Sequence, residues 1–165
     1  MQRVCPQLAP FVRDRSRLLR PTRGPRNTGR TMTPQDVELV AGVYDAFARR
    51  DNAAPFEVYA TDIEWDTSRG FPEGSGSVFH GHEGVRQSIR SMLAAFSVIE
   101  FTVEKIADMG GRVLATVHER YVGRTSGAEV DRRHYTVWTI QDGKITRMCA
   151  FLDRSEALEA ARLSE

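Results

Sequence analysis

The stretch VHERYVG, residues 117–123, holds three ionisable side chains in a row. Its Val and Tyr residues are typical of a β-strand, in which successive side chains point to opposite faces. His118 and Arg120 therefore share one face, and Glu119 lies on the other. An Arg is a fixed cation and a His is a titratable donor or acceptor, so the pair could hold an anionic or carbonyl group of a ligand. The alternative is a set of structural ion pairs with nearby acids.

A second possible source of acid–base chemistry is IEWDTS, residues 63–68, which also has the character of a strand. Its acids Glu64 and Asp66 are candidates for a general base. They alternate with Ile63 and Trp65, so only one of the two pairs can face an interior. Trp65 is the better wall for a pocket, and the orientation of Asp66 stays open.

The sequence HGHE, residues 80–83, has the look of a metal site because two His stand two residues apart. A convincing third ligand is missing nearby, and Glu83 at a helix start also suits the helix dipole. The sequence contains no Gly-rich phosphate loop, no GxSxG and no alternation of parallel strands with helices. We therefore expect no metal, no cofactor and no nucleotide-binding fold.

Hydrophobic periodicity and turn residues predict an α+β domain. Helices are expected over residues 34–50, 54–60 and 82–95, and a short last helix in residues 153–163 is capped by Asp153 or Ser155. Strands are expected over residues 63–68, 97–108, 112–123, 130–141 and 144–152. The Gly110-Gly111 and Asp142-Gly143 pairs predict tight hairpins, so the last four strands form an antiparallel meander.

Two-residue turns also set the expected register of the meander. The expected pairs are Val103 with His118, His118 with Tyr135, Tyr135 with Ala150, and Val137 with Met148. One face then carries Phe101, Val103, Thr116, His118, Arg120, Tyr135, Val137, Met148, Ala150 and Leu152. The other carries Thr102, Glu104, Ala115, Val117, Glu119, Tyr121, His134, Thr136, Trp138, Arg147, Cys149 and Phe151. Both faces mix apolar and charged residues, which is typical of a sheet covered on both sides.

The order of these elements, together with GRTSGAEV, VWTIQDGKITR and AFLDRSEALEAA, resembles the SnoaL-like branch of the nuclear transport factor 2-like (NTF2-like) superfamily. The resemblance implies a cone, in which the meander and short N-terminal strands form a curved sheet that wraps around N-terminal helices and an apolar pocket. It also implies a homodimer through the outer face of the sheet. The superfamily includes cyclases, isomerases, hydrolases, dehydratases and non-catalytic binding domains, so the resemblance does not choose a reaction.

The resemblance further implies which face lines the pocket. Pocket residues on the final strand of related enzymes correspond to Met148, Ala150 and Leu152. The expected pocket residues are Tyr44, Trp65, Tyr135, Val137, Met148, Ala150 and Leu152, with His118 and Arg120 also looking into the cone. Glu119, Trp138 and Arg147 are expected to look outward, the last two as cross-strand neighbours.

Limonene-epoxide hydrolases of the superfamily use an Arg between two Asp to position water and protonate the epoxide. Arg120 matches the Arg, but Val122 and Ala150 stand where the resemblance requires the acids. A side chain without a carboxylate cannot transfer a proton. We therefore do not expect epoxide hydrolysis.

Ketosteroid isomerases use a Tyr on the first helix and two Asp on strands. The corresponding positions here are Val43, Thr67 and Val137. Tyr44 and Asp66 are each one residue from the first two of these positions, so a small shift would restore part of the set.

Two functions stay open on these grounds. The first is a cofactor-independent cyclase, isomerase or dehydratase acting on a carbonyl-containing substrate, with Asp66 or His118 as the base and Arg120 stabilising an enolate-like oxygen. The second is a non-catalytic domain that binds a small apolar or carbonyl-containing ligand or serves as an accessory dimerisation module. They differ in whether a carboxylate reaches the pocket.

Charge is distributed unevenly along the chain. Eight of the 23 basic and one of the 22 acidic residues lie in residues 1–31, so this segment carries about +7 and residues 32–165 about −6. An acidic domain is a poor match for nucleic acid, and no apolar run is long enough to span a membrane. Cys5 and Cys149 stand in different contexts, so we expect no disulfide and a cytoplasmic location.

Residues 1–31 are rich in Arg, Pro and Gly and are expected to be disordered, ahead of one folded domain at residues 32–165. Three explanations stay open for the segment. It is translated sequence upstream of a start at Met32, an Arg-rich organellar transit peptide, or an arm that binds anions.

Overall fold

The computed structural model describes residues 34–71 and 76–162. In chain order, the elements are α1 (Pro34–Ala48), α2 (Pro55–Val58), β1 (Tyr59–Arg69), β2 (Val78–His80), α3 (Gly81–Ala95), β3 (Phe96–Asp108), β4 (Arg112–Gly123), β5 (Glu129–Gln141), β6 (Lys144–Phe151) and α4 (Arg154–Arg162). The predicted α+β class is confirmed. Predictions for residues 1–33 lie outside the described residues.

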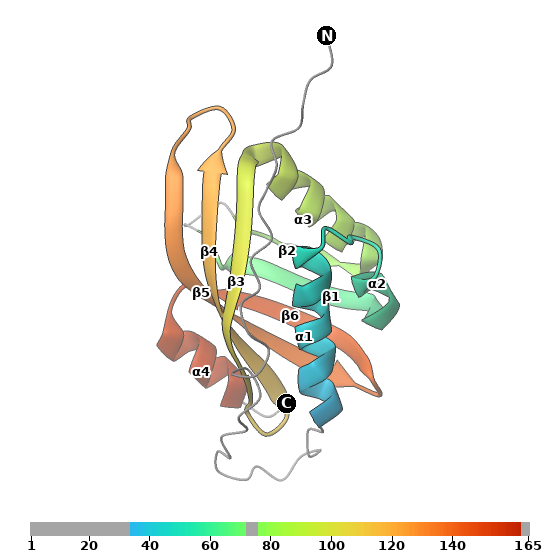
Figure 1. Cartoon of the computed structure of the whole chain (residues 1–165). Helices are drawn as coiled ribbons and strands as arrows, with labels where there is room; N and C mark the ends of the chain where they lie inside the picture. Colours follow the sequence, from blue (N-terminus) through green and yellow to red (C-terminus); the bar gives the residue numbers. More distant parts are fainter. Residues whose placement is uncertain (1–33, 72–75, 163–165) are drawn as a thin grey trace.

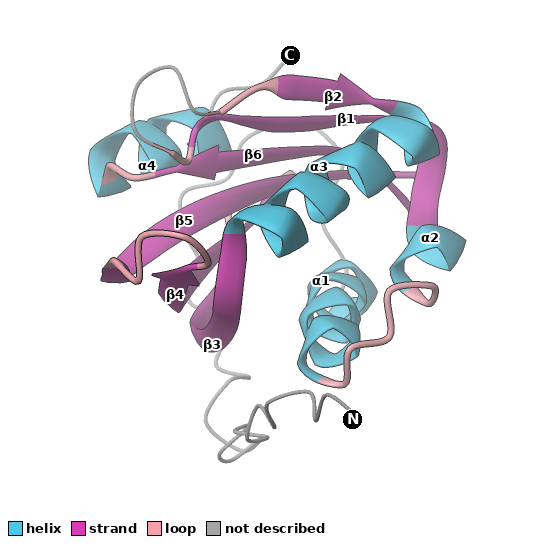
Figure 2. Ribbon diagram, turned by 90° about the horizontal axis from the view of Figure 1, so that it is seen from above, coloured by secondary structure: helices cyan, strands magenta, loops and turns pink. Residues whose placement is uncertain are grey.

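The strands form one curved sheet in the order β2-β1-β6-β5-β4-β3 (Figure 1). Neighbouring strands are antiparallel except β1 and β6, which run parallel. Helices α1 and α3 lie against one face of the sheet, whereas α4 packs on the other (Figure 2). We call these the inner face and the outer face.

A β-bulge in β3 changes the register of the first hairpin. Close to the Gly110-Gly111 turn, the pairing of β3 with β4 is the expected one. The register then shifts between Val103 and Lys105, so that His118 lies opposite Thr102 and the predicted pairing with Val103 is wrong. A rule that counts outward from the turn cannot detect an extra residue in one strand.

A second shift, between β5 and β6, has a larger consequence. The observed pairs are Trp138 with Met148 and Thr136 with Ala150, in place of the predicted Val137 with Met148 and Tyr135 with Ala150. A slip of one residue exchanges the two faces of a strand. Met148 and Ala150 therefore share the face of Trp138, as does Glu119, and the predicted orientation of the sheet residues is wrong.

The inner face and α1 enclose the main hydrophobic core. Its most buried members include Val40 and Val43 of α1, Trp65 of β1 and Trp138 of β5, none more than 8% exposed. Burying such side chains stabilises the fold by about 1.5–3 kcal/mol each. Tyr44, Met148 and Ala150, three of the predicted pocket residues, belong to the same core.

Helix α4 covers part of the outer face. Its Ala157 and Ala161 pack in a second cluster with Leu114, Val137, Cys149 and Phe151 of the sheet. Of the two predicted caps, Asp153 and Ser155, it is Asp153 that caps the helix, because its Oδ1 accepts hydrogen bonds from the backbone N–H groups of Ser155 and Glu156. Small residues on α4 let the helix lie close to the sheet.

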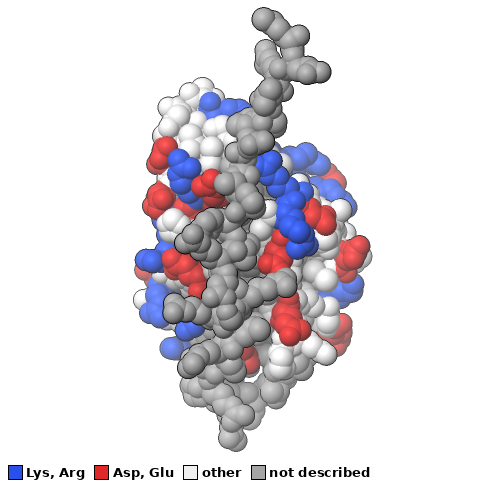
Figure 3. Space-filling model, in the orientation of Figure 1, with Lys and Arg blue, Asp and Glu red and all other residues white. Residues whose placement is uncertain are grey.

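Acidic and basic side chains are interspersed on the face shown in Figure 3. No helix in residues 34–71 or 76–162 is long and apolar enough to cross a membrane.

Candidate functional site

The inner face of β4 and β5 carries a buried carboxylate. Glu119 is 2% exposed. Its Oε1 accepts a hydrogen bond from Nε of Arg132 at 2.6 Å, its Oε2 lies 2.8 Å from Nδ1 of His134, and the Tyr121 hydroxyl donates to Oε2. Three ionisable side chains, those of Arg132, His134 and Tyr121, thus meet around one buried acid.

Strand geometry brings these residues together. Glu119 and Tyr121 are two residues apart on β4, and Arg132 and His134 are two residues apart on β5, so each pair shares a face. The register places Glu119 directly opposite Arg132. Rings of Phe96 and Phe101 from β3 contact Tyr121, with centroids 4.8 and 5.9 Å away.

The carboxylate of Glu119 is held in its charged form. Burial alone would raise the pKa of Glu119, but hydrogen bonds and opposite charge from His134, with hydrogen bonds from Tyr121 and Arg132, lower it below its usual range. Burial and the neighbouring carboxylate both raise the pKa of Tyr121, so this phenol stays protonated and acts as a donor. The cluster therefore places a stable anion beside an imidazole.

His134 is the group in this cluster best suited to exchange protons with a ligand. Its Nδ1 lies 2.8 Å from Oε2 of Glu119, and its Nε2 is on the opposite side of the ring. A carboxylate on one ring nitrogen fixes the orientation of the imidazole and leaves the other nitrogen for chemistry. The His134 side chain is 10% exposed, so it lies near the limit of the buried region.

Arg132 links the cluster to the end of β1. Besides its contact with Glu119, its guanidinium donates to the Gly70 carbonyl at 3.1 Å and lies 6.0 Å from the centre of the Phe71 ring. Gly70 is needed here because a Cβ would lie 2.5 Å from the Ala150 Cβ. The side chain of Arg132 is 23% exposed and is the most accessible part of this ion pair.

A second buried polar chain lies on the same inner face. The Trp138 indole donates to Oγ1 of Thr136 at 2.8 Å, and the Tyr44 hydroxyl lies 2.7 Å from the same oxygen. Burial chiefly raises the pKa of Tyr44, and the charge of Glu119 adds to this effect. The charge of the Glu119 carboxylate therefore acts on the Tyr44 hydroxyl.

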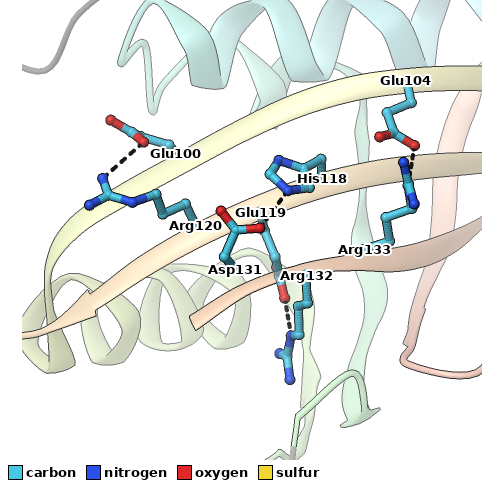
Figure 4. Close-up of polar contacts among 8 residues, drawn as sticks. All are labelled: Glu100, Glu104, His118, Glu119, Arg120, Asp131, Arg132 and Arg133. Carbon is cyan, nitrogen blue, oxygen red and sulfur yellow. Dashed lines mark hydrogen bonds and ion pairs between the residues drawn. The ribbon is translucent and has the colours of Figure 1, made fainter. Parts of the chain in front are cut away.

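The predicted pair of His118 and Arg120 lies on the outer face (Figure 4). His118 Nε2 is 2.8 Å from Asp131, and Arg120 pairs with Glu100 at 3.3 Å and Glu129 at 3.1 Å. Their side chains are 38% and 36% exposed. His118 and Arg120 thus form surface ion pairs, which was the alternative to a ligand site. Their acidic partners are Glu100 of β3 and Glu129 and Asp131 of β5.

Asp66 also lies away from the Glu119 cluster. It is opposite Cys149 on the outer side of β1 and accepts hydrogen bonds from the backbone and hydroxyl of Ser68. Glu64 shares that side and pairs with Arg147 at 2.8 Å. Trp65 packs in the core on the inner face, on the opposite side of β1 from Glu64 and Asp66.

The remaining predicted pocket residues divide between the two faces. Tyr44, Met148 and Ala150 pack in the inner core, whereas Val137 and Tyr135 belong to the cluster under α4. Leu152 is 37% exposed and follows the end of β6. The structure therefore does not bring the predicted pocket and catalytic residues together at one place.

Sequence reasoning assigned Glu119 and Trp138 to the outer face and gave His134 no role. The signal was present, because the predicted face that carries Glu119 also carries Val117, Tyr121, His134 and Trp138. A sheet face that carries a Trp among apolar residues is more often buried than a face that carries a His and an Arg, such as His118 and Arg120. Burial, rather than the resemblance, would have selected the correct face.

Side chains of the HGHE segment contact neighbouring groups of the protein. His82 Nε2 lies 3.3 Å from the Tyr59 carbonyl, and Glu83 pairs with Arg90 at 2.6 Å. No group of three or more His, Cys, Asp or Glu side chains in residues 34–71 and 76–162 is arranged to hold a metal ion.

A hollow of about 330 Å³ lies on the outer face between the sheet and α4. Its lining includes Arg69, Arg112, Arg147, Glu156 and Glu159. Charges of both signs line it, and the sheet separates it from the Glu119 cluster. It is therefore distinct from the site on the inner face.

Comparison with known proteins gives a consistent result. A family model described as a SnoaL-like domain matches residues 40–148. An NTF2-like protein from Burkholderia thailandensis is 26% identical, with a TM-score of 0.66 over 82% of this chain and 100% of that one. A candidate SnoaL-like polyketide cyclase from Mesorhizobium loti is 24% identical, with a TM-score of 0.59 over 73% and 99%. TerC, co-crystallised with polyporic acid, is 20% identical, with a TM-score of 0.62 over 78% and 99%. No curated protein matches.

Proposed function

Because the chain belongs to the family of SnoaL-like domains, we propose that it binds a small carbonyl-containing molecule at the inner face of its sheet and transfers a proton on it. The observation that carries the proposal is the 2.8 Å approach of His134 Nδ1 to Glu119 Oε2, which places one ring nitrogen against a carboxylate and the other on the opposite side of the ring. This arrangement serves the cyclase, isomerase or dehydratase class and needs no cofactor.

The roles follow from the contacts. Glu119 orients the imidazole, while Tyr121 and Arg132 donate hydrogen bonds that keep Glu119 ionised and in place. Nε2 of His134 removes a proton next to the carbonyl of the ligand and returns it to another position. A positioned acid–base group accelerates such a step by about 10²–10⁴-fold.

Solvent exchange tests this role without knowledge of the natural substrate. Enolisable ketones such as acetophenone are incubated with the protein in D₂O, and loss of the methyl proton signal is followed by NMR. We expect His134→Gln to abolish the enzyme-dependent exchange. The matched control is His118→Gln, which removes an imidazole that is also paired with a carboxylate but lies on the outer face. Equal exchange by both variants would refute the role of His134.

A non-catalytic binding domain is the second candidate. The observation in its favour is that Glu119 has partners on both carboxylate oxygens, an arrangement that also stabilises a core. This candidate predicts that probes such as acetophenone or polyporic acid bind, seen as quenching of the Trp65 and Trp138 fluorescence, without any exchange in D₂O.

We also propose a homodimer through the part of the outer face that α4 leaves open. Ion pairs from three strands run across this area, among them Arg133 with Glu104 at 2.7 Å. A surface that carries both acidic and basic side chains can form ion pairs with the same surface of a second copy of the protein. Sedimentation equilibrium would measure the association, and a monomer at all concentrations would exclude the dimer. The cytoplasmic location and the boundary between residues 1–31 and 32–165 remain predictions.

A further inference from the structure

The hydroxyl of Tyr59 is a buried polar group without a partner. Tyr59 begins β1 and is 2% exposed, and its oxygen has no hydrogen-bond partner in the described part of the chain. Buried hydroxyls are nearly always hydrogen-bonded, because leaving one unpaired costs as much free energy as a lost hydrogen bond. A Phe would fill the same space without this cost, so the hydroxyl calls for a physical explanation.

The surroundings of Tyr59 are aromatic. The Phe56 and Trp65 rings lie with centroids 5.5 and 5.8 Å from the Tyr59 ring. Burial is the main cause that raises the pKa of Tyr59, and the phenol of Tyr44 adds to this effect. The Tyr59 hydroxyl therefore remains protonated and can donate a hydrogen bond.

Tyr44 connects this hydroxyl with the Glu119 cluster. Its phenol is influenced by the charge of Glu119 and in turn influences Tyr59. Its own oxygen lies 2.7 Å from Oγ1 of Thr136, whereas that of Tyr59 has no hydrogen-bond partner among residues 34–71 and 76–162. Ring contacts connect Tyr59 to Tyr44 through Trp65 and Trp138, with successive centroids 5.8, 5.9 and 5.8 Å apart.

We propose that Tyr59 is a ligand-orienting residue whose hydroxyl donates a hydrogen bond to a neutral carbonyl oxygen of the molecule bound at the inner face. A neutral acceptor fits because the rings that contact Tyr59, those of Phe56 and Trp65, are uncharged and would not compensate an anion for its lost hydration. The assignment rests on the proposed binding site. The hydrogen bond from Tyr59 would favour ligands that carry a carbonyl oxygen, and it takes no part in the proton transfer by His134.

Two probes of nearly equal shape isolate the hydrogen bond. Acetophenone carries a carbonyl oxygen where α-methylstyrene carries a methylene group, and only the former accepts a hydrogen bond. Binding is measured through the fluorescence of Trp65 and Trp138, the two tryptophans of the chain. We expect Tyr59→Phe to lower the preference for acetophenone by about fivefold while leaving the affinity for α-methylstyrene unchanged.

Tyr135→Phe is the matched control, since it removes a phenolic hydroxyl from the cluster under α4 and should leave both affinities unchanged. Urea unfolding of unliganded Tyr59→Phe should give a midpoint at or above that of the wild type, because an unpaired hydroxyl is removed. An unchanged preference in Tyr59→Phe, or a lower unfolding midpoint, would overturn the assignment. Failure of both probes to bind the wild type would instead refute the proposed binding site.

Discussion

Glu119 and His134 contact each other across two strands, with Oε2 and Nδ1 2.8 Å apart, although the residue directly opposite Glu119 is Arg132. The diagonal contact makes Glu119 the shared partner of two basic side chains. Removing its charge would leave both without an anion in a buried setting.

Glu119→Gln should therefore destabilise the protein strongly. Loss of one member of a buried, hydrogen-bonded ion pair costs about 3–5 kcal/mol, because the opposite charge stays buried without compensation. Urea unfolding measures the change. The control is Glu129→Gln, which removes a carboxylate that is 61% exposed and pairs with Arg120 on the surface. That variant should change stability by less than about 1 kcal/mol, and similar losses for both variants would contradict the structural role of Glu119.

Stability should fall in acid because of the same group. The pKa of Glu119 in the folded protein lies below its ordinary value of 4.5, so the folded state binds fewer protons than the unfolded state near that pH. The contribution is complete above about pH 4.5 and is lost as the pH falls toward the folded-state pKa. Unfolding free energies measured from pH 6 to pH 3 should therefore decline more steeply for the wild type than for Glu119→Gln. Parallel curves would contradict the shift.

Two glycines offer a matched pair of substitutions. Gly70→Ala places a Cβ 2.5 Å from that of Ala150 and should destabilise by about 1–3 kcal/mol. Gly42 lies within α1, and a Cβ there meets nothing within 4 Å. Gly42→Ala should stabilise by about 0.5–1 kcal/mol, because Ala is the better helix former. Thermal unfolding of both variants tests the prediction, and a neutral Gly70→Ala would show that the end of β1 can move away from β6.

The thiol of Cys149 should react slowly in the native protein. Burial is the main cause that raises its pKa, and the residue is 8% exposed under α4. Because only the thiolate attacks disulfide reagents, the rate should be on the order of a hundredfold lower in native than in urea-unfolded protein. The measurement uses a Cys5→Ser variant, so that a single thiol is followed. Equal rates would mean that α4 opens readily.

The sequence by itself determined the elements of the fold. Alternation in β3 to β6, turn glycines and helical periodicity all arise from neighbouring residues, so residues 112–123 form the predicted strand and Asp153 caps the predicted helix. The family resemblance also led to the correct fold, because the order of elements is a property of the chain. Register close to the Gly110-Gly111 turn followed from the turn itself.

Only the tertiary structure decided which side chains meet. Turn type does not predict the two register shifts, which lie between Val103 and Lys105 and between Thr139 and Ile140. Because of the second shift, Met148 lies opposite Trp138 and not opposite Val137. Because side chains alternate with a period of two, that single slip exchanged the inner and outer faces. Packing of α1 against Trp138 then buried Glu119 and His134 and left His118 and Arg120 at the surface.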